Sequence, residues 1–205
     1  MPAITSIKPQ RNKRRVNVSL NGRFAFGIDL ENYVRLGLKI KQELSEDEVK
    51  GIIKKAEFQK IWDKLLKFVT LRPRSEKEIR DYFKRKKIPE SFHLELCDKL
   101  KRLELINDEK FAQWWLEQRL EFKHKSKREL IFELRNKGLS KTVIEKALGV
   151  VSIDEPRSAR KLLEKSGYRW QKLKPQQAKQ KKIAFLLRKG FIWETVDQIV
   201  NKVVK

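Results

Sequence analysis

The chain contains two copies of one sequence pattern, and this repeat constrains its fold more than any other feature. The copies are SEKEIRDYFKRKKIP (75–89) and SKRELIFELRNKGLS (126–140), which start 51 residues apart. Each begins with Ser, has Glu three residues later, and carries apolar residues at matching positions: Ile79 and Leu130, Phe83 and Leu134, Ile88 and Leu139. A Ser-x-x-Glu pattern before an apolar run predicts a helix N-terminus closed by a capping box, in which each side chain bonds to the backbone of the other residue.

A third and more divergent copy lies near the end of the sequence. FLLRKGF (185–191) aligns with FELRNKGL (132–139) when one residue is omitted before the glycine, so that Gly190 matches Gly138. This copy lacks the Ser at its helix start and has Pro175 there instead. A period of about 50 residues has room for three helices, and it predicts tandem three-helix units that each bury an apolar face against their neighbours.

The N-terminal segment follows a different pattern, which is typical of β-structure. RRVNVSLNGRFAFGI alternates apolar and polar residues around Asn21-Gly22, a dipeptide that favours the type I′ turn of a β-hairpin. LKIKQEL (38–44) alternates again, which allows a further strand. The expected elements are strands near Arg14–Leu20 and Arg23–Ile28, followed by a short helix at 30–36 that Asp29 caps and Gly37 ends.

From Ser45 onward the spacing of apolar residues predicts helices. One long helix should start after Ser45 and end before Pro73. Further helices are expected at 76–86, 90–103, 108–122, 127–136, 141–148, 155–166, 176–188 and 193–203. The expected fold is mainly α, with three tandem three-helix repeats stacked in a line and a small N-terminal module that contains the β-hairpin. The expected domains are 1–44 (β-rich extension), 45–106 (linking helix and first repeat), 107–153 (second repeat) and 154–205 (third repeat).

The charge of the chain points to a polyanionic partner. The formal net charge is +23, and the excess of Lys and Arg is spread along the whole sequence. Such a charge exceeds what solubility requires and causes self-repulsion, so nucleic acid is the natural explanation. A generally lysine-rich proteome is the alternative. The sequence has no apolar stretch approaching 18 residues and no signal core at its start, which predicts a cytoplasmic protein.

The sequence does not predict an enzyme. His93 and His124 are the only histidines, and neither has Cys or Asp clustered nearby, so a metal site or His-dependent catalysis lacks partners. The chain has neither a glycine-rich phosphate loop nor a nucleophile elbow. The acids in EDEVK (46–50) suit the N-terminus of a helix better than a nuclease metal site. We therefore expect no catalytic residues, metal or cofactor.

The five tryptophans allow two interpretations. Indole rings can stack on bases of single-stranded nucleic acid. Four of the five share helical spacing with other apolar residues, however, which favours packing in the core. Because Trp114 and Trp115 are adjacent, they cannot both face one interior.

Basic residues recur at one place in the three copies, at the end of the second helix. They are Lys84–Lys87 in the first copy, Arg135 and Lys137 in the second, and Arg188 and Lys189 in the third. Cations are favourable at helix C-termini, which is a purely structural explanation. Periodic placement would also form a stripe of positive charge suited to a phosphate backbone, extended by Arg11–Arg15 and Lys172–Lys182. The candidate DNA- or filament-binding residues are Arg72, Arg74, Lys84, Arg85, Lys127, Arg128, Arg135, Lys137, Lys181, Lys182, Arg188 and Lys189.

These motifs, in this order and spacing, resemble the RecX family over about residues 58–203. The stretches that carry the resemblance are LRPRSEKEIRDYF (71–83), LINDEKFAQWWLEQR (105–119), KSKRELIFELRNKGLS (125–140) and FLLRKGF (185–191). The hairpin region is similar to the N-terminal extension of longer members. Two features depart from the family pattern: Lys87 stands where a glycine is common, and the first helix of the third repeat matches loosely.

The resemblance implies a mainly α fold of three tandem three-helix repeats in an elongated curved array, and it implies a function as well. RecX proteins are cytoplasmic bacterial modulators of the RecA recombinase, and the family implies binding in the groove of the RecA–single-stranded DNA filament. It also implies inhibition of strand exchange, ATP hydrolysis or LexA cleavage. The expected partners are therefore the RecA filament and single- and double-stranded DNA, with no membrane, and the protein is expected to be a monomer.

A DNA- or RNA-binding protein that acts without RecA is the alternative function. RNKGLSKTVIEKAL (135–148) resembles the turn of a helix-turn-helix. The same turn recurs in each copy, which fits a scaffold better than a base-reading element.

Overall fold

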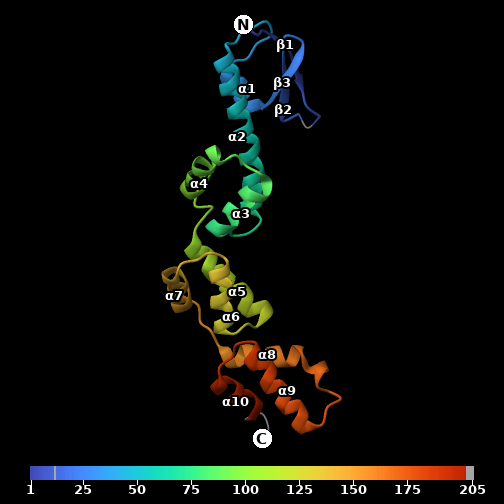
Figure 1. Ribbon diagram of the computed structural model, residues 1–205, viewed down its shortest axis with the longest axis vertical. Helices are drawn as coiled ribbons and strands as arrows, with labels where there is room; N and C mark the ends of the chain where they lie inside the picture. Colours follow the sequence, from blue (N-terminus) through green and yellow to red (C-terminus); the bar gives the residue numbers. More distant parts are fainter. Residues whose placement is uncertain (12, 202–205) are drawn as a thin grey trace. The chain divides into compact units, whose positions relative to one another are not determined.

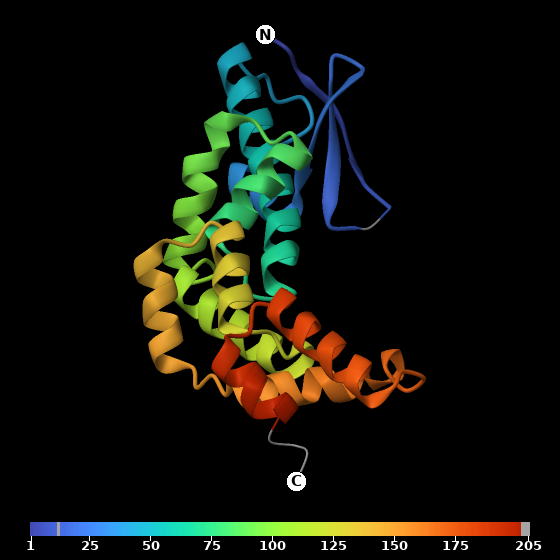
Figure 2. The same cartoon turned by 60° about the horizontal axis from the view of Figure 1, so that its bottom comes forward.

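The computed structural model describes residues 1–11 and 13–201, and these divide into two compact units. The first unit contains residues 1–71 and 90–96. The second contains residues 72–89 and the chain from Cys97 onward. Figures 1 and 2 show the elements of each unit along the chain.

The first unit is built on a three-stranded antiparallel sheet in the order β1-β2-β3. The strands are β1 (Ile4–Pro9), β2 (Arg15–Leu20) and β3 (Arg23–Asp29). Asn21 and Gly22 join β2 to β3 with φ angles of 47° and 79°, as the predicted type I′ turn requires. The predicted hairpin is therefore confirmed.

One strand was missed by the sequence analysis and one was wrongly allowed. β1 was missed because its alternation is weak and Pro9 ends it. Residues 38–44 add no strand to the sheet. Their one β-contact is an isolated bridge between Glu43 and Ala3.

Two helices complete the core of the first unit. α1 (Leu30–Leu36) is capped at its N-terminus by Asp29 and is followed by Gly37, which has a left-handed φ of 59°. Both ends are as predicted. α2 (Glu46–Thr70) packs on the sheet through Ile52 and Ala56. The sheet residues of this core are Ile4, Val16, Val18, Phe26 and Ile28.

The second unit begins with α3 (Glu76–Lys86). Lys87 ends α3 with a left-handed φ of 51°, so it takes the conformation that a glycine would adopt without strain. The chain then passes through a short 3₁₀ turn, η1 (Glu90–Phe92), into α4 (His93–Arg102). The turn and the part of α4 up to Leu96 belong to the first unit, and α4 from Cys97 onward belongs to the second.

Two helical bundles follow within the second unit. In the first bundle, α5, α6 and α7 enclose a core that includes Phe111, Leu116, Leu130 and Leu134. The second bundle is formed by α8, α9 and α10 (Figure 2). Its core includes Trp170, Phe185 and Leu186. The elements are α5 (Asp108–Lys123), α6 (Lys127–Asn136), α7 (Lys141–Val150), α8 (Glu155–Lys165), η2 (Gly167–Arg169), α9 (Pro175–Arg188) and α10 (Trp193–Asn201).

The mainly helical fold with a small N-terminal sheet is confirmed. The predicted helix starts and ends mostly fall within two residues of those observed. Residues 202 and 203, which were expected to extend the last helix, lie outside the described part of the chain.

Candidate functional site: the repeat joints and the cations around them

Ser75 and Ser126 are fully buried, and each links one helical repeat to the next. The Ser75 hydroxyl accepts a hydrogen bond from the Glu78 N–H at 3.2 Å and donates one to the Lys137 carbonyl at 2.8 Å. The Ser126 hydroxyl accepts from the Glu129 N–H at 3.2 Å and donates to the Lys189 carbonyl at 2.6 Å. Each serine therefore caps its own helix and also satisfies the carbonyl that ends a helix in the following repeat.

A carboxylate adds a second bond at each of these places. The Glu76 backbone N–H donates to Asp108, the first residue of α5, at 2.9 Å. The Lys127 N–H donates in the same way to Glu155, the first residue of α8, at 2.9 Å. We call the two sets the first joint (Ser75, Glu76, Asp108, Lys137 and Gly138) and the second joint (Ser126, Lys127, Glu155, Lys189 and Gly190).

Both joints bring the backbone of two repeats close together at a glycine. Gly138 has a φ of 83° and Gly190 a φ of 81°, a conformation that side chains rarely adopt. A Cβ on Gly138 would lie 2.7 Å from the Lys77 Cβ, and one on Gly190 would lie 2.9 Å from the Ser126 Oγ. The glycine of the Lys-Gly pair in the sequence motif is thus explained by the joint, where only glycine fits.

Of the two hydrogen bonds predicted for each capping box, only the one accepted by the serine forms at Ser75 and Ser126. The complete box, with bonds in both directions, forms at Ser45, where Glu48 bonds back to the Ser45 N–H at 2.7 Å. At Ser75 and Ser126 the serine caps the helix, but the carboxylate of Glu78 or Glu129 is held by cationic side chains instead. Ion pairing has replaced the reciprocal half of the box.

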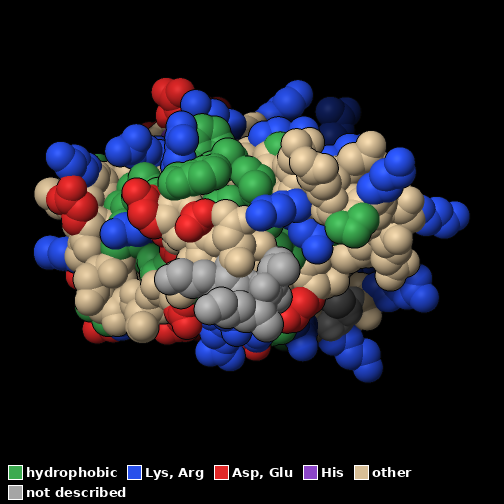
Figure 3. Space-filling model, turned by 90° about the horizontal axis from the view of Figure 1, so that it is seen from below, with side chains coloured by type: hydrophobic (Ala, Val, Ile, Leu, Met, Phe, Trp, Pro, Cys, Tyr) green, Lys and Arg blue, Asp and Glu red, His purple; other side chains and the backbone are tan. Residues whose placement is uncertain are grey.

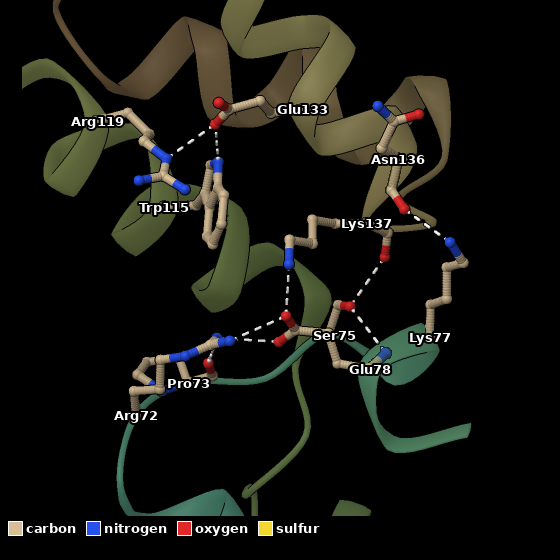
Figure 4. A network of polar contacts seen from close by, with 10 residues as sticks. All are labelled: Arg72, Pro73, Ser75, Lys77, Glu78, Trp115, Arg119, Glu133, Asn136 and Lys137. Carbon is tan, nitrogen blue, oxygen red and sulfur yellow. Dashed lines mark hydrogen bonds and ion pairs between the residues drawn. The ribbon is translucent and has the colours of Figure 1, made fainter. Parts of the chain in front are cut away.

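Glu78 is the centre of a polar network beside the first joint (Figure 4). Arg72 binds its carboxylate with two hydrogen bonds of 2.9 Å, and the Lys137 ammonium, 59 residues away in the chain, donates at 2.7 Å. Burial raises the pKa of Glu78, but the hydrogen bonds and charges of Arg72 and Lys137 outweigh it, so the pKa lies below its ordinary value. The carboxylate is therefore held ionised between two repeats.

Trp115 continues this network into the first bundle, formed by α5, α6 and α7. Its indole N–H donates to Glu133 at 2.9 Å, and the Arg119 guanidinium donates to the same oxygen at 2.8 Å while lying 4.1 Å from the centroid of a Trp115 ring. The Lys137 ammonium lies 4.7 Å from a Trp115 ring centroid (Figure 4). Lys125 also binds Glu133 at 2.7 Å. Trp115 is thus buried, and cation–π contacts and ion pairs surround its side chain.

The candidate cations fall into two groups in the structure. Arg72 and Lys137 bind Glu78, and Arg74, Lys182 and Lys189 are partly buried. The remaining candidates are exposed, at the end of α3, along α6 and along α9: Lys84, Arg85, Lys127, Arg128, Arg135, Lys181 and Arg188.

A basic cavity in the third repeat includes a residue that the sequence analysis did not select. The cavity, of about 340 Å³, is lined by Arg169, Trp170, Lys181, Phe185 and Arg188 together with Ala184. The Arg169 guanidinium lies 5.4 Å from the Phe185 ring centroid. Arg169 was missed because it lies in the irregular η2 turn, outside the repeated pattern.

The tryptophans are mostly core residues, as the spacing favoured. Trp62, Trp115 and Trp170 are buried, Trp114 is partly buried beneath the Arg72 guanidinium, and Trp193 is 53% exposed. Among the described residues, no cluster of three or more His, Cys, Asp or Glu side chains could hold a metal ion. None of the helices in that part of the chain has the length and apolarity needed to cross a membrane.

The fold and the joints define a helical-repeat protein whose cationic side chains surround the contacts between repeats. Residues 107–148 match the RecX second three-helix domain, and residues 154–200 match the RecX third three-helix domain. Residues 2–45 match the regulatory protein RecX N-terminal domain. The chain belongs to the RecX family, a family of regulatory proteins.

Full-length relatives and solved structures agree with this assignment. The chain is 33% identical to regulatory protein RecX of Clostridium perfringens strain SM101, over 98% of this chain and 96% of that protein. It is 31% identical to regulatory protein RecX of Bacillus velezensis, over 98% of this chain and 78% of that protein. A crystal structure of regulatory protein RecX matches with a TM-score of 0.70 at 25% identity, over 98% of this chain and 100% of that chain. RecX from Lactobacillus salivarius shares the fold, with a TM-score of 0.59 at 24% identity, over 71% of this chain and 96% of that chain.

Proposed function

We propose that the protein is a non-enzymatic regulator that binds in the groove of the RecA–single-stranded DNA filament and inhibits RecA. The inhibited activities are strand exchange, ATP hydrolysis and the coprotease action on LexA. It acts as a monomer in the bacterial cytoplasm, in DNA recombination, repair and the SOS response. Membership of the RecX family supports this function.

The observation that carries the proposal is the exposed charge near the ends of three helices. Lys84 and Arg85 in the last turn of α3, Arg135 in the last turn of α6 and Arg188 at the end of α9 are all exposed. The joints bond each following repeat to the one before it, so they keep these cations at a fixed spacing. Cations that recur at one helix end in each of three repeats, on a chain of net charge +23, suit a DNA phosphate backbone, which carries charge at regular intervals.

Inhibition requires no catalytic group in this proposal. A protein that binds along the filament groove excludes the incoming DNA strand and LexA from it. Phosphate contacts hold the protein at any DNA sequence, because they carry no sequence information. Regulation then depends on the amount of protein bound and is independent of the sequence of the DNA.

A comparison of two concentrations tests the proposed function. We expect the protein to inhibit the DNA-dependent ATPase of RecA at a concentration well below the one at which it coats the same DNA without RecA. Steady-state ATP hydrolysis and gel-shift titration, at one salt concentration, measure the two values. Inhibition that appears only when the bare DNA is coated would contradict the proposal and support the RecA-independent alternative.

Replacing the exposed cations tests the DNA contacts. A variant with Lys84, Arg85, Arg135 and Arg188 changed to Ala should bind all DNA sequences more weakly. The slope of log K against log salt should fall by about 1 for each lost phosphate contact. Fluorescence anisotropy over a range of salt measures this slope.

The matched control removes the same charge from other exposed lysines. These lysines already have carboxylate partners within the chain: Lys50, Lys110, Lys141 and Lys146. Changing all four to Ala should leave the salt slope nearly unchanged. Equal slopes for the two folded variants would show that net charge alone, rather than the helix-end cations, determines DNA binding.

A further inference from the structure

The two joints share one backbone arrangement but differ on their outer surfaces. Aligning Ser75 with Ser126 places Asp81 of α3 opposite Phe132 of α6. Aligning the joint glycines, Gly138 and Gly190, places Ser140 opposite Ile192. The first joint thus carries polar side chains at two exposed positions where the second carries large apolar ones.

The apolar side chains of the second joint lie in an open groove between α6 and the turn before α10. Phe132 is 64% exposed and Ile192 is 54% exposed. The groove has a volume of about 740 Å³, and it is lined by Lys127, Arg128, Ile131, Phe132, Arg135, Glu155, Gly190, Phe191 and Ile192. Figure 3 shows hydrophobic side chains gathered beside Lys and Arg side chains on the face of the molecule seen from below.

The fold does not require apolar residues at these positions. The first joint forms the same serine and carboxylate bonds with Asp81 and Ser140 in their place. Large apolar side chains left in water gain nothing for stability, and grouped exposed ones mark interaction sites. Phe132 and Ile192 are therefore best explained by a partner that covers them.

The rim of the groove defines the charge of that partner. Lys127, Arg128 and Arg135 are exposed around it. The acid that lines it, Glu155, accepts the Lys127 backbone N–H in the second joint. Apolar anchors surrounded by cations complement a segment that has carboxylates next to apolar side chains.

We propose that this groove docks an acidic protein segment, with one or two apolar anchor side chains, supplied by the RecA filament. The inference rests on the proposed function and adds to it a protein-binding surface that shares only Arg135 with the proposed phosphate contacts. A second copy of the chain is a poorer occupant, because two chains of charge +23 repel each other. Single-stranded DNA is also poorer, because Phe132 is the one exposed aromatic side chain among the described residues lining the groove. Phe191 is buried, and Ile131 and Ile192 offer no aromatic face on which further bases could stack.

The first joint provides the substitutions that test the inference. The double variant Phe132→Asp/Ile192→Ser gives the groove the residues that the first joint already has at these positions. The variant should therefore keep the fold, which circular dichroism and thermal unfolding will check. We expect its affinity for the RecA–single-stranded DNA filament to fall about tenfold or more, as for loss of a buried anchor. Its affinity for single-stranded DNA without RecA should stay unchanged. Phe122→Asp, at a 60% exposed Phe outside the groove, is the control and should bind the filament normally.

Each other outcome has a distinct meaning. Unchanged filament affinity in the folded double variant would overturn the inference and leave the proposed function intact. An equal loss of affinity for bare DNA would overturn it by identifying nucleic acid as the occupant. Self-association of the wild-type chain that the double variant abolishes would overturn it in favour of a second copy. A wild-type chain that does not bind the filament at all would contradict the proposed function and this inference with it.

Discussion

Gly138→Ala should lower the free energy of unfolding by about 3 kcal/mol, because it combines backbone strain with overpacking. The φ of Gly138 is 83°, where a side chain is strained. In addition, its new Cβ would lie 2.7 Å from the Cβ and 2.9 Å from the Cδ of Lys77 on α3. A Cβ cannot rotate away as the end of a flexible side chain can, so the first joint itself would have to open.

Two other glycines separate these causes. Gly37 has a φ of 59° but nothing within 4 Å of a new Cβ, so Gly37→Ala should cost only the strain, about 1–2 kcal/mol. Gly149, inside α7, has open space and no positive φ, so Gly149→Ala should stabilise the protein by up to about 1 kcal/mol. Urea unfolding followed by circular dichroism gives all three values. If Gly138→Ala cost no more than Gly37→Ala, the close approach at the joint would be disproved.

Local patterns were enough to predict the helices and their caps. The repeat identified the capping serines, Ser75 and Ser126, and the glycines Gly138 and Gly190 that follow helix ends in the second and third copies. These could be predicted because helix caps and left-handed helix ends depend on residues close in the chain. The same approach missed the second hydrogen bond of each serine. That bond reaches a carbonyl 62 or 63 residues away, and a sequence pattern holds no information on which carbonyl will lie opposite.

The candidate site was less predictable for the same reason. Lys137 was selected as a possible phosphate contact because it is basic and lies at a helix end. In the structure its ammonium binds Glu78, which lies in another repeat, and it also lies over Trp115. The groove beside the second joint could have been detected from the sequence by comparing the copies position by position, since Phe132 aligns with Asp81. The positions that the copies share predict the fold, whereas this groove is marked by a position at which they differ.

Glu78→Gln should destabilise the protein by about 2–3 kcal/mol at neutral pH, because it leaves Arg72 and Lys137 facing each other without a carboxylate. Removing one partner of a fully buried ion pair costs roughly 3–5 kcal/mol. The side chains of Arg72 and Lys137 are 29% and 28% exposed, so part of their charge returns to water and the cost is smaller. Glu109→Gln is the matched control. Its carboxylate binds Lys146 at 3.0 Å, but both side chains are more than half exposed, so the change should cost under about 1 kcal/mol.

The pH dependence of this difference identifies ion pairing as its cause. The pKa of Glu78 in the folded protein lies below the ordinary value of 4.5, because the bonds from Arg72 and Lys137 outweigh the opposing effect of burial. A group whose pKa is lowered on folding stabilises the protein fully above its unfolded pKa, and this contribution is lost as the pH falls through the folded pKa. The gap in unfolding free energy between wild type and Glu78→Gln should therefore be constant at neutral pH and shrink below about pH 4.5.

Glu133, whose pKa is also lowered, is present in both proteins and cancels in the comparison. Urea unfolding at a series of pH values measures the gap, and a gap that stays constant through the acid range would show that Glu78 acts through its shape and hydrogen bonds rather than its charge.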